Sequence, residues 1–227
     1  MDVVLLDYNG VVVDDEAIHF ASLRDLLAVE RIAVDEADYR EHFLGFDDPT
    51  CIRDAFRRAG RPLEPDAVGL LAARKAAWYA ESARGGVPLV PDVTRFVRQV
   101  AATARIAIVS GALRAEIDAG LALAGLADLI PVIVSAEDVA AGKPDPEGYR
   151  LALARLADGA AVRAVVLEDS LPGLAAARAL GAGCVAFTTT HPAADLRAAD
   201  LVWRSFEGHA PAELAPLFRE VSVPARA

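Results

Sequence analysis

Short runs of aliphatic and β-branched residues alternate, over most of the chain, with longer segments in which apolar residues recur at helical spacing. The first run, residues 3–7, ends in Asp7, and Gly10 breaks the pattern shortly afterwards. A continuous apolar run of this length, followed by a turn residue, is typical of a strand buried in a parallel sheet. The pattern therefore predicts an opening strand with a carboxylate at its carboxyl end.

Only helical spacing is found between residue 15 and about residue 84, where Gly and Pro residues separate the segments. The spacing predicts four helices, over Ala17–Val29, Tyr39–Leu44, Cys51–Ala59 and Ala67–Ala83. The Gly-Gly-Val-Pro segment at 85–88 is typical of a linker. A helical block of this size after the first strand predicts a separate lid domain over the strand ends.

Strand and helix patterns alternate regularly after a helix that opens at Pro91. The expected strands are Ile106–Val109, Val132–Val134, Ala164–Leu167, Cys184–Phe187 and Leu201–Trp203. The expected helices between them are Leu113–Leu123, Pro146–Leu156 and Pro172–Leu180, with one more near Glu213–Phe218 and an unstructured end after it. This alternation predicts an α/β, Rossmann-like parallel sheet core over 1–14 and 86–227, with an inserted all-helical cap domain over 15–85.

Composition narrows the function classes. The 227 residues include 23 Lys and Arg against 33 Asp and Glu, a formal net charge of −10. An acidic chain without a basic run is a poor match for nucleic acid or an anionic membrane surface. No segment reads as a signal peptide or a membrane span, so we expect a soluble, cytoplasmic protein. Cys51 and Cys184 form no CxxC pair, which favours two reduced, buried thiols.

Polar residues follow four of the predicted strands or precede the next helix. They are Asp7 and Asn9, Ser110 and Gly111, Lys143, and Glu168 with Asp169. Parallel strands would bring these ends to one sheet edge, where open α/β sheets bind ligands. Carboxylates are hard oxygen ligands that favour Mg²⁺, and a hydroxyl with free N–H groups at a helix start suits phosphate oxygens. Each residue alone is more often a helix cap or a surface charge, but the coincidence of all four predicts a phosphoryl-transfer site.

These segments resemble the motifs of the haloacid dehalogenase-like hydrolases, in the branch with a helical cap that includes β-phosphoglucomutase and phosphoglycolate phosphatase. The resemblance is carried by Asp7-Tyr8-Asn9-Gly10-Val11-Val12-Val13-Asp14, Val109-Ser110-Gly111, Gly142-Lys143-Pro144 and Glu168-Asp169-Ser170-Leu171-Pro172-Gly173. It extends over nearly the whole chain up to Phe187, and Asp15-Glu16-Ala17-Ile18-His19 is similar to the entry into the cap.

The resemblance implies a role for each matching residue. Asp7 would be the nucleophile that becomes an aspartyl-phosphate, and Ser110 with Lys143 would hold the transferred phosphoryl group. Mg²⁺ would be bound by Asp7, Asp169 and the backbone carbonyl of Asn9, with Glu168 ligating directly or through water. His19 and Leu44-Gly45 would lie at the hinge and in the cap, where members of the family recognise a small phosphorylated metabolite. For His19, a plain surface position on a helix is an equally good interpretation.

Asn9 departs from the family pattern, because phosphatases and mutases of this type carry Asp two residues after the nucleophile. An amide keeps the backbone carbonyl for a metal but cannot give or take a proton, and loss of a general acid/base typically costs about 10²–10⁴-fold in rate. Asn9 is explained as an introduced substitution in an active phosphatase, as a natural feature of a slow enzyme or one with another base, or as the mark of a non-catalytic binder of phosphate esters. The first two explanations are favoured, because the other catalytic positions are intact.

Three further activities stay open on the sequence. A sugar-phosphate mutase of the β-phosphoglucomutase type would need the same motifs. A haloacid dehalogenase would need no metal, which leaves the acidic pair Glu168-Asp169 without a purpose. A phosphonatase would need a Schiff-base lysine in the cap, and the one candidate there, Lys75, lies late in the fourth cap helix. The sequence indicates neither the physiological substrate nor an oligomeric state.

Overall fold

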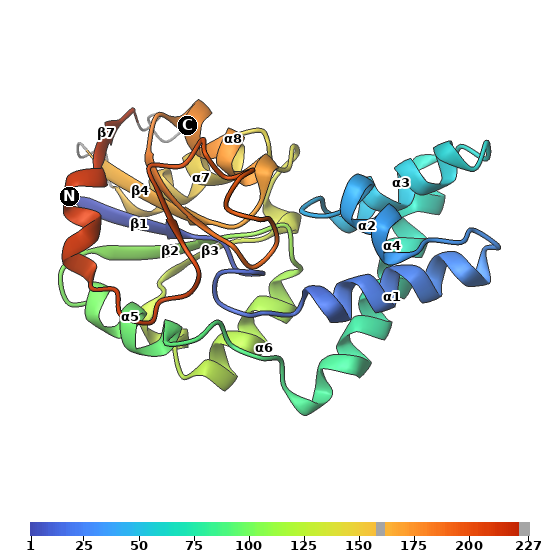
Figure 1. Cartoon of the computed structure of the whole chain (residues 1–227), viewed down its shortest axis with the longest axis horizontal. Coiled ribbons are helices and arrows are strands. Elements are labelled where there is room, and N and C mark those ends of the chain that lie inside the picture. Colours follow the sequence, from blue (N-terminus) through green and yellow to red (C-terminus); the bar gives the residue numbers. More distant parts are fainter. Residues whose placement is uncertain (158–161, 223–227) are drawn as a thin grey trace. The chain divides into compact units, whose positions relative to one another are not determined.

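The computed structural model describes residues 1–157 and 162–222, and these form two compact units (Figure 1). The first unit consists of Met1–Asp14 and Pro88–Ala227, and the second of Asp15–Val87. The chain therefore divides after Asp14 and after Val87, where the sequence led us to expect divisions after residues 14 and 85. We call these the α/β unit and the helical unit.

A parallel sheet forms the centre of the α/β unit (Figure 1). Its strands are β1 (Asp2–Leu6), β2 (Arg105–Val109), β3 (Val132–Val134), β4 (Val162–Glu168), β5 (Gly183–Phe187) and β6 (Leu201–Trp203). They run parallel in the order β3-β2-β1-β4-β5-β6. The central β1 pairs with β2 on one side, Leu6 opposite Ile108, and with β4 on the other, Leu6 opposite Leu167. The expected α/β, Rossmann-like parallel sheet is confirmed.

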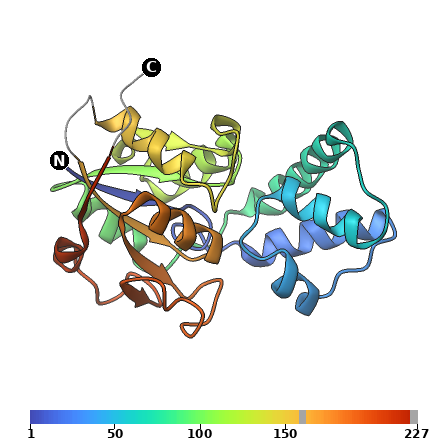
Figure 2. The same cartoon turned by 90° about the horizontal axis from the view of Figure 1, so that it is seen from above.

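Helices cover both faces of this sheet (Figures 1 and 2). They are α5 (Val93–Val100), α6 (Arg114–Ala124), α7 (Glu147–Leu156) and α8 (Leu171–Leu180), with short 3₁₀ turns at Ala127–Leu129 and Ala136–Asp138. Alternate strand residues such as Leu5, Val166 and Ala186 pack with α7 and α8 in one apolar cluster. Their neighbours along the strands face the opposite layer, as the period of two in a strand requires.

An aromatic cluster packs on the opposite side of β5. Phe96 of α5 lies 5.7 Å from Trp203 and 4.9 Å from Phe206 between ring centroids, and Phe187 lies 4.6 Å from Phe206. Phe96, Phe187 and Phe206 have no exposed surface, so the cluster joins α5, β5 and β6 through large buried side chains.

The carboxyl-terminal segment differs from the sequence-based expectation. The helix expected near Glu213–Phe218 is a 3₁₀ helix over Pro211–Leu217, and Arg219–Val221 forms an antiparallel strand, β7, against the start of β4. The Arg-Glu-Val segment lacks the apolar run that reveals the other three-residue strands, and its pairing is set by the partner strand. The expectation of an unstructured end is therefore wrong for Arg219–Val221, and its remainder, 223–227, lies outside the described residues.

The helical unit contains α1 (Glu16–Val29), α2 (Glu36–His42), α3 (Asp48–Arg58) and α4 (Pro65–Ser82), followed by a 3₁₀ turn at Ala83–Gly85. Asp47 caps α3 by accepting a hydrogen bond from the Thr50 N–H at 2.8 Å, which fits the Asp-x-x-Thr spacing. Leu26, Ile52 and Phe56 lie at the centre of its apolar core. The four helices expected from the sequence are all present.

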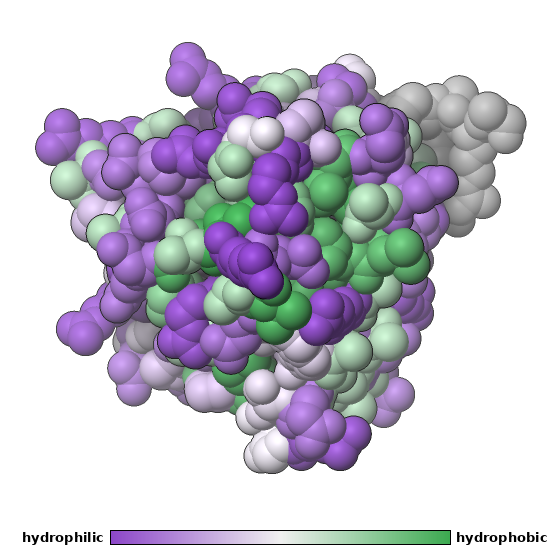
Figure 3. Space-filling model, turned by 90° about the vertical axis from the view of Figure 1, so that its right-hand side faces the viewer, coloured by the Kyte–Doolittle hydropathy of each residue, from purple (hydrophilic) through white to green (hydrophobic). Residues whose placement is uncertain are grey.

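Hydrophobic residues are interspersed with hydrophilic ones on the face drawn in Figure 3. Among the described residues, no helix combines the length and the apolar character that crossing a bilayer requires. Cys51 and Cys184 are buried free thiols, and burial raises the pKa of each, which keeps them protonated and unreactive.

Replacement of Phe206 by Ala tests the contribution of the aromatic cluster. We expect the free energy of unfolding of the α/β unit to fall by about 3–5 kcal/mol, because the substitution leaves a cavity among three aromatic rings. Urea denaturation followed by Trp203 fluorescence in a Trp78→Phe background measures this. Leu123→Ala, at a side chain that is 70% exposed, is the control and should change stability by less than about 0.5 kcal/mol.

Candidate active site

Asp7 lies directly beyond β1, at the carboxyl edge of the sheet. Its backbone N–H donates to the Leu167 carbonyl at 2.9 Å, which continues the pairing of β1 with β4 past the last strand residue. The Tyr8 N–H donates to Asp7 Oδ1 at 2.8 Å and fixes the carboxylate. Asp7 is 7% exposed, so the carboxylate is nearly buried at the point where the sequence predicts a nucleophile.

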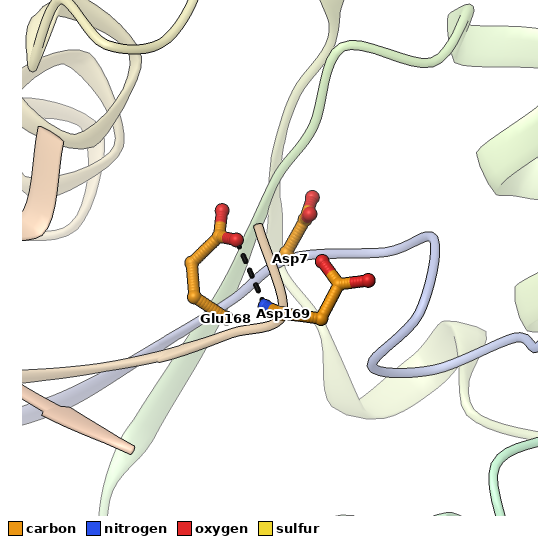
Figure 4. A group of neighbouring side chains, drawn as sticks. All are labelled: Asp7, Glu168 and Asp169. Carbon is orange, nitrogen blue, oxygen red and sulfur yellow. Dashed lines mark hydrogen bonds between the residues drawn. The ribbon is translucent and has the colours of Figure 1, made fainter. Parts of the chain in front are cut away.

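Glu168 and Asp169 approach Asp7 from the end of β4, the strand beside β1 (Figure 4). One carboxylate oxygen from each of these three side chains lies within 4.8 Å of the others. All three residues are buried, which makes their mutual repulsion strong because little water screens it. Such a group requires a positive charge nearby.

Lys143 provides a positive charge within hydrogen-bonding distance. Its Nζ lies 3.0 Å from Asp7 Oδ1 and forms a second ion pair with Glu168 Oε1. Burial alone would lower the pKa of Lys143, but the charges of Asp7 and Glu168 outweigh burial and raise the pKa, so the ammonium stays charged. One lysine therefore links the ends of β1 and β4.

Glu168 is fully enclosed by hydrogen-bond donors. Its Oε1 accepts from Lys143 Nζ and from Tyr149 OH at 3.0 Å, and its Oε2 accepts from the N–H groups of Asp169 and Ser170 at 2.9 and 3.0 Å and from Ser170 Oγ at 3.0 Å. Burial favours a raised pKa, but Lys143 and the hydrogen bonds dominate and lower the pKa of Glu168. A carboxylate has about four lone-pair sites, so these donors occupy its coordination capacity.

Two glycines leave room for these carboxylates. A Cβ on Gly173 would overlap the Glu168 carboxylate, and a Cβ on Gly10 would overlap the Asp169 carboxylate. Gly10 also has a φ of +71°, which favours glycine over any residue with a side chain. The Gly residues in the first and fourth motifs are thus required by close packing against the acidic group.

Ser110 lies beyond β2 and contacts the first motif directly. Its Oγ donates to Asn9 Oδ1 at 3.2 Å and accepts from the Ala112 N–H at 3.1 Å. The helix that follows, α6, begins only at Arg114. Ser110 is therefore not the N-cap of α6. Its hydroxyl instead makes a tertiary contact with Asn9, which is 101 positions away in sequence.

The structure thus brings most of the expected site residues together within the α/β unit. Asp7, Lys143, Glu168 and Asp169 form one charged group, and Ser110 joins Asn9, two residues after Asp7. Gly111, beside Ser110, is exposed.

His19 and Gly45 belong to the helical unit. His19 Nε2 lies 3.3 Å from Asp15 Oδ2, its Nδ1 lies 2.6 Å from Lys75 Nζ, and its ring stacks on Tyr79 at 4.4 Å. Lys75 is buried and forms an ion pair of 2.7 Å with Asp48. Gly45 has a φ of +81° in the turn after α2. His19 is thus part of a polar network, and a role in substrate recognition stays a prediction for both residues.

Sequence reasoning missed three residues that contact the charged group. Tyr149 of α7 donates to Glu168, Thr190 donates to Asp169 Oδ2, and Thr189 Oγ1 lies 3.4 Å from the same oxygen. The threonines follow β5 directly, so the rule that strand ends meet at one edge could have found them. No such rule identifies Tyr149, because its position depends on the packing of α7.

The donor set fits a hard divalent cation. The three buried carboxylates supply oxygen ligands only. Oxygen ligands of this kind favour Mg²⁺, Ca²⁺ or Mn²⁺ over the softer metals. Asp7, Asp169 and the Asn9 carbonyl could hold the ion, while Glu168 is already saturated by donors.

Comparison with known proteins agrees with this arrangement. Residues 1–181 match the family model described as haloacid dehalogenase-like hydrolase. The chain is 38% identical over 97 residues to validoxylamine A 7'-phosphate phosphatase of Streptomyces hygroscopicus subsp. limoneus. This alignment covers 43% of this chain and only 45% of that relative. The chain is also 28% identical over 202 residues to protein CbbY of Cereibacter sphaeroides, in an alignment that covers 84% of this chain and 87% of that protein.

Solved structures show the same similarity. The crystal structure of CbbY from Rhodobacter sphaeroides in complex with phosphate has a TM-score of 0.79 and 26% identity, over 94% of this chain and 98% of that one. A mutant of the same protein in complex with xylulose-(1,5)bisphosphate also has a TM-score of 0.79, at 27% identity over 93% of this chain and 98% of that one.

The environment of Asp7 predicts a pH-dependent effect on stability in metal-free protein. Burial, and then the charge of Glu168, raise the pKa of Asp7 from 3.8 to about 7. Between these values the folded state holds the proton more tightly than the unfolded state, so Asp7 lowers stability increasingly as the pH rises through this window. We expect Asp7→Asn to raise the melting temperature more at about pH 8.5 than at about pH 5.5.

Thermal unfolding in the presence of a chelator measures this difference. Asp25→Asn, which removes a carboxylate at an exposed position on α1, is the control for the substitution itself. An effect of Asp7→Asn that is equal at both pH values would contradict the raised pKa.

Proposed function

The chain belongs to the haloacid dehalogenase-like hydrolases, and we propose that it is a Mg²⁺-dependent phosphomonoester hydrolase that acts through an aspartyl-phosphate on Asp7. One observation carries this proposal. Lys143 Nζ lies 3.0 Å from Asp7 Oδ1, and a carboxylate oxygen of Asp169 lies within 4.8 Å of one from Asp7. A nucleophile, a fixed cation and a metal ligand thus converge on one point, which is what in-line phosphoryl transfer needs.

Asp7 would attack the phosphorus with one carboxylate oxygen, so that an O–P bond forms as the bond from phosphorus to the ester oxygen breaks. The leaving oxygen would take its proton from solvent water, since Asn9 cannot supply one. Lys143 would neutralise charge on the phosphoryl oxygens without giving up its proton, because its pKa is raised by the carboxylates around it. Ser110 and Gly111 would supply a hydroxyl and a backbone N–H to the same oxygens. Water would then attack the phosphorus and release phosphate and the free Asp7 carboxylate.

Asp7, Asp169 and the Asn9 carbonyl would hold Mg²⁺, with Glu168 acting through water. When bound, the ion supplies positive charge that stabilises the developing negative charge of the phosphoryl group. The saturation of Glu168 by five donors supports the indirect role, because direct ligation would displace Lys143 or Tyr149. Glu168 then serves mainly to place Lys143.

The proposed substrate is a small phosphorylated metabolite. Two relatives support this class, since one is named as a phosphatase of validoxylamine A 7'-phosphate and the other was solved with xylulose-(1,5)bisphosphate. We assign the helical unit as the cap of the family, and we place His19 and Gly45 among the residues that recognise the substrate. A cytoplasmic location is part of the same proposal.

Asn9 would slow both steps of this reaction. Its amide is too weakly acidic to protonate the leaving alcohol and too weakly basic to activate water, although its Oδ1 accepts a hydrogen bond from Ser110. The aspartyl-phosphate should therefore form slowly and persist once formed. The contact between Asp7, the proposed nucleophile, and the Lys143 ammonium supports an impaired phosphatase over a protein that only binds phosphate esters.

Asn9→Asp tests the proposal. We expect phosphate release in the presence of Mg²⁺ to rise by about 10²–10⁴-fold, because the substitution supplies the missing general acid and base. A screen of phosphomonoesters, including sugar phosphates, with both proteins measures the change. Intact-protein mass spectrometry of the unsubstituted chain should in turn detect a covalent phosphoryl group that Asp7→Asn removes.

The double variant Asp7→Asn/Asn9→Asp is the matched control and should release no phosphate. If Asn9→Asp gives no gain on any phosphomonoester, the impaired-phosphatase proposal fails. Binding of Mg²⁺ and a phosphate ester without labelling of Asp7 in either protein would instead identify a binding module.

A further inference from the structure

Thr189 and Thr190 lie in the turn that follows β5, the strand beside β4 in the sheet. Thr190 is 5% exposed and Thr189 is partly buried. Neither residue belongs to the four motifs that define the site. Their position at the carboxyl end of a parallel strand nevertheless places them at the same sheet edge as Asp7 and Asp169.

Thr190 contacts the acidic group directly, since its Oγ1 donates a hydrogen bond to Asp169 Oδ2. Thr189 Oγ1 lies 2.6 Å from the Gly10 carbonyl oxygen and 3.4 Å from Asp169 Oδ2. A hydroxyl has one proton, so Thr189 donates to the nearer oxygen, that of Gly10. The two hydroxyls therefore hold two different parts of the site.

The contacts differ from the ordinary role of threonine in a turn. Threonine hydroxyls in turns usually bond to backbone groups a few residues away. Here Thr190 reaches a side chain 21 positions away, and Thr189 reaches a carbonyl 179 positions away. Both hydroxyls bond to groups outside their own turn, so formation of the turn does not account for these contacts.

Both contacts act on groups that must be oriented if the site is to hold a cation. A carboxylate turns freely about its last bond, and a donor on Oδ2 fixes which way the other oxygen of Asp169 faces. Gly10 follows Asn9, and its carbonyl is held by Thr189, so the turn that contains the Asn9 carbonyl is fixed as well. The absent Cβ of Gly10 lets Asp169 approach this turn closely.

We propose that Thr190 and Thr189 are positioning residues of the metal site: Thr190 orients the Asp169 carboxylate, and Thr189 fixes the Asn9–Gly10 turn. The inference rests on the proposed function, because it assumes that Asp169 and the Asn9 carbonyl bind a divalent cation. Groups that hydrogen-bond to metal ligands tune both ligand direction and affinity, and their loss typically weakens metal binding by about 10–100-fold.

Thr190→Val tests the proposal because it removes the hydroxyl and keeps the shape of the side chain. We expect the dissociation constant for Mg²⁺, measured by isothermal titration calorimetry without substrate, to rise by about 10–100-fold. Thr190→Ser keeps the donor and should bind Mg²⁺ within about threefold of the parent chain. Thr189→Val should also weaken binding.

Thr188→Val is the matched control, since Thr188 lies in the same turn and its backbone N–H pairs with the Trp203 carbonyl. It should bind Mg²⁺ as the parent does. Should Thr190→Val fail to fold, as judged by its melting temperature, Thr190→Ala replaces it, because it removes the hydroxyl without placing a methyl group beside the carboxylate. The same loss of affinity is then expected.

The outcomes separate the two proposals. If the parent binds Mg²⁺ and the Thr190 variants without a hydroxyl bind it equally well, the positioning role is overturned while the proposed function stands. Equal losses in Thr190→Ser and Thr190→Val would also overturn it, because the effect would then come from packing. If the parent chain binds no Mg²⁺, the proposed function itself fails, and this inference fails with it.

Discussion

Repulsion between three buried carboxylates is the constraint on which the site depends. Asp7, Glu168 and Asp169 bring three negative charges to the ends of two adjacent strands, and Lys143 neutralises only part of that charge. In a poorly solvated site such an excess is unfavourable, which is why burial and Glu168 raise the pKa of Asp7. A divalent cation would balance the remaining negative charge. It would also favour the ionised form of Asp7, which is the form that can act as a nucleophile.

The parallel sheet allows this grouping because it sets the order of the strands. With β1 between β2 and β4, Asp7 has Ser110 on one side and Glu168 with Asp169 on the other. The β5 turn then reaches Asp169 from the next strand. Residues that are far apart in sequence are fixed by backbone pairing, so little entropy remains to be lost when a ligand binds.

The sequence predicted the parts of this arrangement that depend on periodicity and strand ends. Buried strands give continuous apolar runs, and polar residues directly after them mark one edge, so Asp7, Ser110 and Asp169 could be found. Contacts that depend on packing could not be found in this way. Tyr149 reaches Glu168 only because α7 packs against the sheet, and the short β7 forms where the start of β4 extends beyond its pairing with β5. The hydrogen bond from Ser110 to Asn9 likewise depends on tertiary packing, since the two residues are 101 positions apart in sequence.

Asn9 acquires a physical meaning in this setting. An aspartate at position 9 would add a further ionisable carboxylate two residues from Asp7, in a site where negative charge already exceeds positive charge. The amide avoids that repulsion and still accepts the hydrogen bond from Ser110 through Oδ1. Asn9 therefore adds no further negative charge beside the carboxylates of Asp7, Glu168 and Asp169.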